Sequence, residues 1–373
     1  MSGNSNRGHE LSTLILDIDD LATVLDDVGL DAFMDELIGQ MRSDIRGFDP
    51  AQVQSQVRSG FAYDTPEQGM IEWMPTMTRG DVVTVKTVGY HPLNPKRRSI
   101  PSVLATTALY DTNSGGLVAL TEATLLTAIR TGAASAVITE AVTHDRPITL
   151  GVVGCGAQAV TQVHAISRVR QIASLVVTDV DLGIARTLDA RLPNGLPVPQ
   201  IYERGSFERM IETVDVLVTA TSVDIGKGPV VDLTHAPSHL HINAVGSDFP
   251  GKTELPLDYL RRSVVIADHV AQCLIEGESQ RLDPSELGPD MVEVLARDWS
   301  PLKSQQTVFD STGWAYEDLI VATQFLAHAM RLQLGTVTTL QRTPIDPYDP
   351  YEVTRVSAER RSDGRLASPH DPA

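Results

Sequence analysis

The feature that most constrains this chain of 373 residues is a glycine-rich segment at residues 147–159, PITLGVVGCGAQA. A short apolar strand pattern runs directly into Gly154-x-Gly156-x-x-Ala159, and a helical pattern follows. Gly154 permits a tight turn, Gly156 lets the backbone approach a pyrophosphate, and Ala159 allows close packing of helix on strand. The helix N-terminus then offers free N–H groups to a phosphate. The segment predicts a dinucleotide-binding turn; the alternative is a glycine turn in an α/β fold that binds no nucleotide.

A dinucleotide-binding turn is usually followed by an acidic residue at the end of the next strand, and this chain has one there. Asp179 ends the next apolar strand pattern, at residues 174–179. A carboxylate there can accept hydrogen bonds from both ribose hydroxyls and would repel a 2′-phosphate, so we expect NAD rather than NADP. Cys155, inside the turn, has no adjacent His or Lys that would activate it, so we expect a small filler and not a nucleophile.

The rest of the chain divides into two patterns. From residue 147 onward short apolar strands alternate with helices, which predicts a parallel, doubly wound sheet with strands at 147–153, 174–179, 199–202, 214–220, 239–245 and 263–268. Before it, alternating segments predict an antiparallel module with strands at 70–76, 81–90, 102–110 and 115–120. Helices are expected at 14–48, 121–143 and 314–334, after a frayed terminus of residues 1–12.

The composition excludes some classes of partner and indicates the cellular compartment. The 30 Lys+Arg and 48 Asp+Glu give a net charge of −18, which argues against nucleic acid because phosphate binding needs clustered cations. Two cysteines cannot form a disulfide framework and fit a reducing cytoplasm. A polar N-terminus and the lack of an apolar run of about 18 residues predict neither a secretion signal nor a membrane span. His91 and His241 lack metal-ligand spacing, so no metal site is expected.

Six motifs occur in one order along the chain: GMIEWMP (69–75), VKTVGYHPLNP (85–95), LTAIRTGAASA (126–136), GVVGCGAQA (151–159), HINAVGSDFPGKTELP (241–256) and FDSTGWAYED (309–318). Together they resemble the ornithine cyclodeaminase/mu-crystallin family, from about residue 14 to 350. The resemblance implies an α/β fold with an NAD-binding Rossmann domain at residues 134–324. An α+β substrate-binding and dimerisation domain would combine residues 1–133 with 325–373, of which 355–373 are expected to be disordered. It also implies a homodimer, with tightly held NAD and the active site between the domains.

Two acids match the catalytic positions of the family. Asp248 follows the expected strand HINAVG, at the carboxyl end where open α/β sheets bind ligands, and can take a proton from a substrate α-ammonium. Glu72 lies between two apolar residues of a strand, where a carboxylate needs a partner, and a distal substrate ammonium would be one. The alternatives are that Asp248 caps a loop and that Glu72 lies on a solvated strand face.

Three cations match the carboxylate-binding positions of the family: Arg58, Lys86 and Arg130. The planar fork of Arg130 suits either a substrate carboxylate or the cofactor phosphates, and the alternative for each of the three is a surface cation. For Lys252 an ion pair with Glu254 is an alternative to cofactor binding. The motifs imply cofactor contacts for Ser102, Arg130, Thr131, Gly154, Gly156, Ala157, Gln158, Asp179, Thr221, Ser222, Val245, Lys252 and Ser311.

The resemblance implies an activity on a small basic amino acid. An NAD-dependent, redox-neutral cyclodeaminase would convert L-lysine to L-pipecolate, or L-ornithine to L-proline, and release ammonia. Because such a substrate is net cationic, the negative charge of the protein does not repel it. The first alternative is an NAD(P)H-dependent cyclic-imine reductase or an amino-acid dehydrogenase on the same scaffold. The second is a non-catalytic binding protein, as in the mu-crystallin branch.

Overall fold

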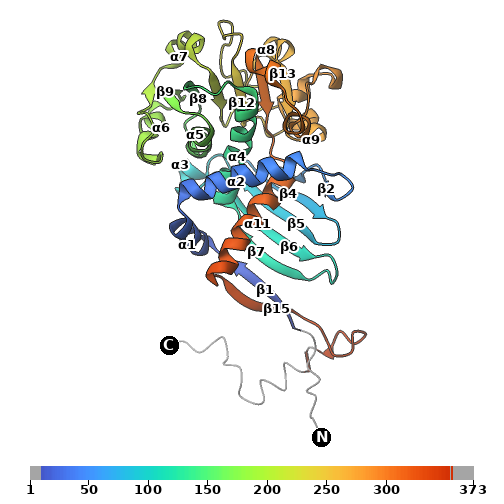
Figure 1. Ribbon diagram of the computed structural model, residues 1–373. Coiled ribbons are helices and arrows are strands. Elements are labelled where there is room, and N and C mark those ends of the chain that lie inside the picture. The colour runs from blue at the N-terminus through green and yellow to red at the C-terminus, as the bar shows by residue number, and fades with distance from the viewer. Residues whose placement is uncertain (1–9, 353, 356–373) are drawn as a thin grey trace.

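Two β-sheets organise the chain, whose computed structural model describes residues 10–352 and 354–355 (Figure 1). The strands of the first sheet are β1 (Glu10–Leu16), β2 (Val53–Ser55), β3 (Ser59–Tyr63), β4 (Gly69–Thr78), β5 (Val82–Tyr90), β6 (Val103–Asp111), β7 (Leu117–Glu122) and β15 (Thr336–Arg342). Their order is β15-β1-β7-β6-β5-β4-β2, with β3 paired to β4. Neighbours are antiparallel except β1 and β7, which are parallel.

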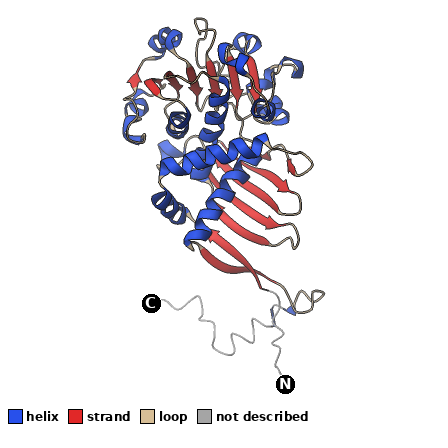
Figure 2. Cartoon of the chain, in the orientation of Figure 1, coloured by secondary structure: helices blue, strands red, loops and turns tan. Residues whose placement is uncertain are grey.

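Helices cover one face of this sheet, as Figure 2 shows. Helix α11 (Ala315–Leu332) lies across it and contacts β2, β4 and β5, and α2 (Leu30–Arg46) and α1 (Ile18–Val28) pack on α11. The short helix α3 (Asn94–Arg98) follows β5. The spacing of α2 explains its place, because Phe33, Leu37 and Met41 recur on one face of the helix and are all fully buried.

The first strand corrects one sequence prediction. Residues 10–16 form β1, whereas we expected a frayed terminus followed by helix from residue 14. Ile15 of β1 pairs with Leu120 of β7 and with Thr336 of β15, and such distant partners leave no local periodicity to read. Strand β15 was not predicted for the same reason. The helical prediction holds from residue 18 to 46, and the disorder expected for 355–373 lies, except for Arg355, outside the described residues.

The second sheet has seven strands, all of them parallel to their neighbours. They are β8 (Ile148–Val153), β9 (Ile172–Thr178), β10 (Gln200–Ile201), β11 (Val216–Thr219), β12 (His241–Ala244), β13 (Val264–Ala267) and β14 (Thr307–Asp310). The order β10-β9-β8-β11-β12-β14-β13 reverses between β8 and β11, and such a switch point is where open α/β sheets bind ligands. The α/β prediction is therefore confirmed, although β14 was not predicted.

The helices that flank this sheet are α5 (Ala157–Val169), α6 (Leu182–Arg186), α7 (Arg204–Met210), α8 (Leu257–Arg262), α9 (Val270–Glu276) and α10 (Met291–Ala296). Helix α4 (Thr124–Val142) links the two sheets, because it contacts β6 of the first and β12 and β14 of the second. Among the described residues it is the one helix long and apolar enough to cross a membrane, but 78% of that stretch is buried inside the protein. The predicted domain boundary after residue 133 falls within α4, and the domain limits remain a prediction.

The close approach of α4 to α5 gives a test at Gly132. A Cβ built there would lie 2.5 Å from the backbone oxygen of Thr161 in α5. Ala is ordinarily the better helix former by about 1 kcal/mol, yet we expect Gly132→Ala to destabilise the protein by about 1–3 kcal/mol because the helices must separate. Gly39 of α2 meets nothing within 4 Å, so Gly39→Ala is the matched control and should be neutral or stabilising. Urea unfolding measures both signs, and a stabilised Gly132→Ala would contradict this packing.

Candidate active site

A cavity of about 530 Å³ opens where the loops that follow the parallel strands meet the first sheet. The first sheet contributes Tyr63 and Tyr90 to its wall. The loops after β11 and β12 contribute Ser222, Phe249 and Lys252. Cavities of this size bind small molecules, and this one lies at the carboxyl ends of the strands.

The glycine turn lies at the same edge and has room for a phosphate. Gly154 has φ of 92°, and a Cβ on it would lie 2.6 Å from the backbone oxygen of Ala220, so only glycine fits. A Cβ on Gly156 would meet nothing within 4 Å, which leaves the backbone open to a ligand. Helix α5 begins at Ala157 without a side-chain cap, so its first N–H groups are available to an anion.

The carboxylate of Asp179 is fixed against this turn. One oxygen accepts the N–H of Cys155 at 2.7 Å, and the other accepts the N–H of Asp181 at 2.8 Å. Arg191, which sequence reasoning missed, donates from Nη2 to the backbone oxygen of Cys155 at 2.8 Å. Burial raises the pKa of the Cys155 thiol to about 12, with Asp179 adding to the effect, so the thiol stays protonated as a filler would.

The remaining predicted cofactor residues fall into two groups. Gln158 lies in the first turn of α5, and Thr131 lies in the adjoining α4, where its hydroxyl donates to Thr127. Ser102 directly precedes Val103, the first residue of β6, which pairs with Tyr90 of β5. The second group gathers at the carboxyl ends of β11, β12 and β14: Thr221, Ser222, Val245, Lys252 and Ser311.

Ser311 and Thr221 differ in whether their polar groups already have hydrogen-bond partners within the protein. The Oγ of Ser311 is buried and has no hydrogen-bond partner among the described residues, so it can serve a bound group. The N–H and hydroxyl of Thr221 are both taken by Glu254, at 2.8 and 2.7 Å. Glu254 also accepts the N–H of Gly246 at 2.9 Å, so it joins two of these loops. Together with the open glycine turn, the buried Ser311 hydroxyl fits a dinucleotide.

Lys252 pairs with the predicted catalytic acid. Its Nζ lies 2.6 Å from Oδ1 of Asp248 and 5.0 Å from the centre of the Tyr90 ring. The alternative pairing of Lys252 with Glu254 is therefore wrong. The carboxylate of Asp248 accepts from this ammonium, and 32% of its side chain is exposed, so a ligand can reach it.

The predicted acid of the first sheet is buried. Glu72 is 7% exposed, so the alternative of a solvated strand face is wrong. Its Oε2 lies 3.5 Å from Nη1 of Arg58, whose Nε lies 2.8 Å from Oε1 of Glu276. Glu276, the last residue of α9, was missed because nothing in its local sequence marks it as a partner of Arg58.

The other two predicted cations are also buried on acids, so the surface alternative is wrong for them as well. The Nζ of Lys86 lies 2.7 Å from the carboxylate of Asp318. Arg130 donates to Asp318 at 3.0 Å and to Glu317 at 2.8 Å. Both acids stand in the first turn of α11, within the motif FDSTGWAYED, where sequence reasoning singled out only Ser311.

Acids outnumber cations in this cluster. Its ion pairs join four cations to five carboxylates: Arg58, Lys86, Arg130 and Lys252, with Glu72, Asp248, Glu276, Glu317 and Asp318. Burial raises the pKa of Glu72, of Glu276 to about 8 and of Glu317 to about 8, against the opposing effect of the nearby arginines. Burial also lowers the pKa of Lys86 to about 8 although Asp318 opposes it. The cluster is short of positive charge, which an ammonium ligand would supply.

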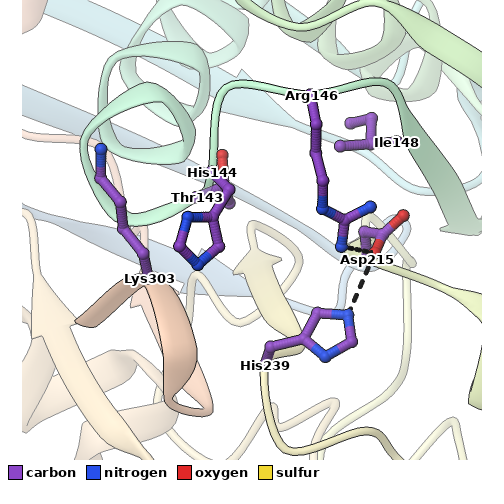
Figure 3. A pocket seen from close by; sticks show the side chains of 7 residues that line it. All are labelled: Thr143, His144, Arg146, Ile148, Asp215, His239 and Lys303. Atoms are coloured by element: carbon purple, nitrogen blue, oxygen red, sulfur yellow. Dashed lines mark hydrogen bonds and ion pairs between the residues drawn. The ribbon is translucent and has the colours of Figure 1, made fainter. Parts of the chain in front are cut away.

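A second, smaller recess lies at the opposite edge of the parallel sheet (Figure 3). Arg146 and His239 both contact the carboxylate of Asp215, at 2.6 and 3.0 Å. The recess is also lined by Thr143, His144, Ile148 and Lys303. Its volume is about 10 Å³, roughly that of one water molecule, so it does not hold an amino acid. These histidines form no metal cluster, and the described residues contain no group of three or more metal-ligating side chains.

The chain is similar to one family over most of its length: residues 19–331 match the model of the ornithine cyclodeaminase/mu-crystallin family. An L-lysine cyclodeaminase from Streptomyces rapamycinicus is 38% identical over 92% of this chain and 100% of the relative. A solved lysine cyclodeaminase, studied for its recognition of L-lysine, L-ornithine and L-2,4-diamino butyric acid, is 40% identical with a TM-score of 0.86, over 91% of this chain and 99% of that one. A solved archaeal alanine dehydrogenase dimer with bound NAD is 26% identical with a TM-score of 0.77, over 88% and 100%. This chain belongs to the ornithine cyclodeaminase/mu-crystallin family.

Proposed function

We propose that this protein is an NAD-dependent cyclodeaminase that converts L-lysine to L-pipecolate, or L-ornithine to L-proline, and releases ammonia. The observation that carries the proposal is the buried cluster in which Arg58 lies between Glu72 and Glu276. A diamino acid brings one carboxylate for the cations and two ammonium groups for the excess carboxylates. The lysine cyclodeaminase that is 38% identical over nearly the whole chain supports the same substrate class.

The residues of the glycine turn fit NAD. Gly154 and Gly156 leave its backbone open, Asp179 offers acceptors for ribose hydroxyls, and Ser311 offers an unpartnered hydroxyl. When bound, NAD supplies an acceptor and then a donor of hydride, so that the overall reaction needs no added reductant. The alanine dehydrogenase with bound NAD, at 26% identity, supports this cofactor.

Asp248 is the group proposed to move protons. Lys252 holds Oδ1 of its carboxylate at 2.6 Å, which leaves Oδ2 for the substrate α-ammonium. Removal of that proton gives the α-nitrogen the lone pair that hydride loss from the α-carbon requires. Glu72 is assigned to the distal ammonium. The distal ammonium would pass a proton to Glu72 and add as a free amine to the oxidised α-carbon, which closes the ring. Asp248 would return a proton to the departing ammonia, and return of the hydride to the same carbon would then give the ring amino acid.

We also propose a homodimer in the cytoplasm. Ile71 of β4, Gly89 of β5 and Leu104 of β6 form one row on the face of the first sheet that α11 leaves uncovered, and Ile71 and Leu104 are 42% and 45% exposed. A second copy of the same apolar face is the occupant that would cover it, and the similar alanine dehydrogenase is a dimer. The buried free thiols of Cys155 and Cys273 fit a reducing compartment.

The reaction is tested by product analysis without added reductant. We expect the purified protein, incubated with L-lysine or L-ornithine and NAD at much less than one equivalent of substrate, to form ammonia together with the matching ring amino acid. Mass spectrometry of the product and an ammonia assay follow this directly. A reductase or dehydrogenase would instead need a stoichiometric cofactor, so failure to form a ring product from either diamine under these conditions rejects the cyclodeaminase.

The role of Asp248 is tested with Asp248→Asn. Loss of the acid and base group should lower kcat by about 100-fold or more, while the bound NAD, measured in the denatured protein, stays at the wild-type level. Asp258→Asn is the matched control, because the side chain of Asp258 is 79% exposed in α8, and it should keep wild-type turnover. Turnover by Asp248→Asn within two-fold of wild type would remove Asp248 from the mechanism.

The dimer is tested with Leu104→Arg. A charge buried at the centre of the proposed interface should shift light-scattering mass from twice the monomer mass toward the monomer. Ile184→Arg is the control, because Ile184 is 42% exposed but belongs to α6 beside the second sheet. A monomeric wild type, or a Leu104→Arg variant that stays fully dimeric, would contradict the proposed interface.

A further inference from the structure

Protein acceptors on three sides hold the guanidinium of Arg58. Its Nε lies 2.8 Å from Oε1 of Glu276, and its Nη2 donates to the backbone oxygen of Thr312. Its Nη1 lies 3.5 Å from Oε2 of Glu72, the longest of these contacts and therefore the weakest. Only 8% of the side chain is exposed, so these acceptors rather than water set its orientation. One nitrogen, Nη1, is left loosely engaged.

The backbone of Glu276 is fixed independently of Arg58. A Cβ on the next residue, Gly277, would lie 2.5 Å from the Asp310 carboxylate, so the end of α9 packs directly on β14. The backbone oxygen of Glu276 accepts from Gln280 at 2.9 Å and from the hydroxyl of Ser247 at 3.4 Å. Ser247 directly precedes Asp248. The carboxylate of Glu276 is thus presented to Arg58 from a rigid element that also contacts the loop of the catalytic acid.

We propose that Glu276 is a positioning residue for Arg58, and that Glu72 is the partner which Arg58 exchanges for the substrate carboxylate. Glu276 and Thr312 hold Nε and Nη2, so the guanidinium cannot turn away when a ligand arrives. The substrate carboxylate then takes Nη1, and Glu72 is released to pair with the distal ammonium. The inference rests on the proposed function, because it assumes a substrate with both groups.

The two glutamates are told apart by their contacts. Glu276 meets Arg58 at 2.8 Å from the end of a packed helix, whereas Glu72 meets it at 3.5 Å from a strand. Gly60 of β3 allows the strand that carries Glu72 to approach closely, since a Cβ there would lie 2.8 Å from Cγ of Glu72. The ion pair with the shorter distance is the one that resists displacement by a carboxylate of equal charge, because Coulomb attraction falls with distance.

Binding of three ligands to NAD-loaded protein tests the assignment. L-Lysine, L-norleucine and 6-aminohexanoate have the carboxylate as the only charged group common to all three. If Glu276 acts through Arg58, Glu276→Gln weakens all three affinities by about ten-fold or more in calorimetry. Glu72→Gln is the matched comparison. It should weaken lysine and 6-aminohexanoate, which lose the partner of their ammonium, but it should not weaken norleucine, for which Glu72 only competes for Arg58. Wild-type affinity of Glu276→Gln for norleucine or for 6-aminohexanoate overturns the proposal, as does failure of wild type to bind either.

The same substitution made in a variant that lacks Arg58 distinguishes a positioning role of Glu276 from a general structural one. In Arg58→Ala, the further change Glu276→Gln should leave lysine affinity unaltered, since no guanidinium remains to be positioned. An equal loss in both backgrounds overturns the proposal. If Glu276→Gln does not fold, Glu276→Asp replaces it, and a raised KM for lysine with kcat retained is the expected result, whereas an unchanged KM overturns the proposal. If the wild-type protein binds all three ligands but forms no ring product, the proposed function is rejected. The role of Glu276 is then decided by the binding affinities alone.

Discussion

The packing of helices α4 and α11 against the first sheet depends on a cluster of buried ion pairs. Arg130 of α4 and Lys86 of β5 share the carboxylate of Asp318 in α11, and all three side chains are almost fully enclosed. Removing one partner from a buried pair typically costs about 3–5 kcal/mol, whereas replacing the whole pair by apolar residues is often neutral or stabilising. Stability alone therefore does not explain such a cluster, whereas the proposed binding of a charged substrate does.

Other buried acids explain why the loops around the cavity keep their shape. Asp310 accepts the N–H groups of Glu278 and Ser279 at 2.9 and 2.8 Å, and Asp268 accepts that of Gly313 at 2.6 Å. A carboxylate with several N–H donors is a strong anchor for a loop that has no sheet or helix partners. Burial raises the pKa of Asp310 to about 6, although Ser279 opposes this, so protonation of this carboxylate as the pH falls through that value favours the folded state over the unfolded one.

The sequence allowed part of this site to be predicted, and the reason is locality. Gly154, Gly156 and Asp179 belong to one βαβ unit, so their spacing alone predicts where they meet. Glu276 and Asp318 could not be found in this way, because their partners, Arg58 just before β3 and Lys86 in β5, lie far away in the chain. The same limit hid β1 and β15, whose pairing joins the two ends of the described chain. The family resemblance located Arg58, Lys86, Arg130 and Glu72, but not the other acids that hold these cations, which are Glu276, Glu317 and Asp318.

The central claim is that a hydride leaves the α-carbon of the substrate and returns to the same carbon within one turnover. The most direct measurement follows L-lysine deuterated at the α-carbon, in ordinary water and without added reductant. The account predicts L-pipecolate that keeps the deuterium at that carbon, with no net NADH in the absorbance at about 340 nm. Pipecolate that has lost the deuterium, or NADH that accumulates in step with lysine consumption, would contradict it.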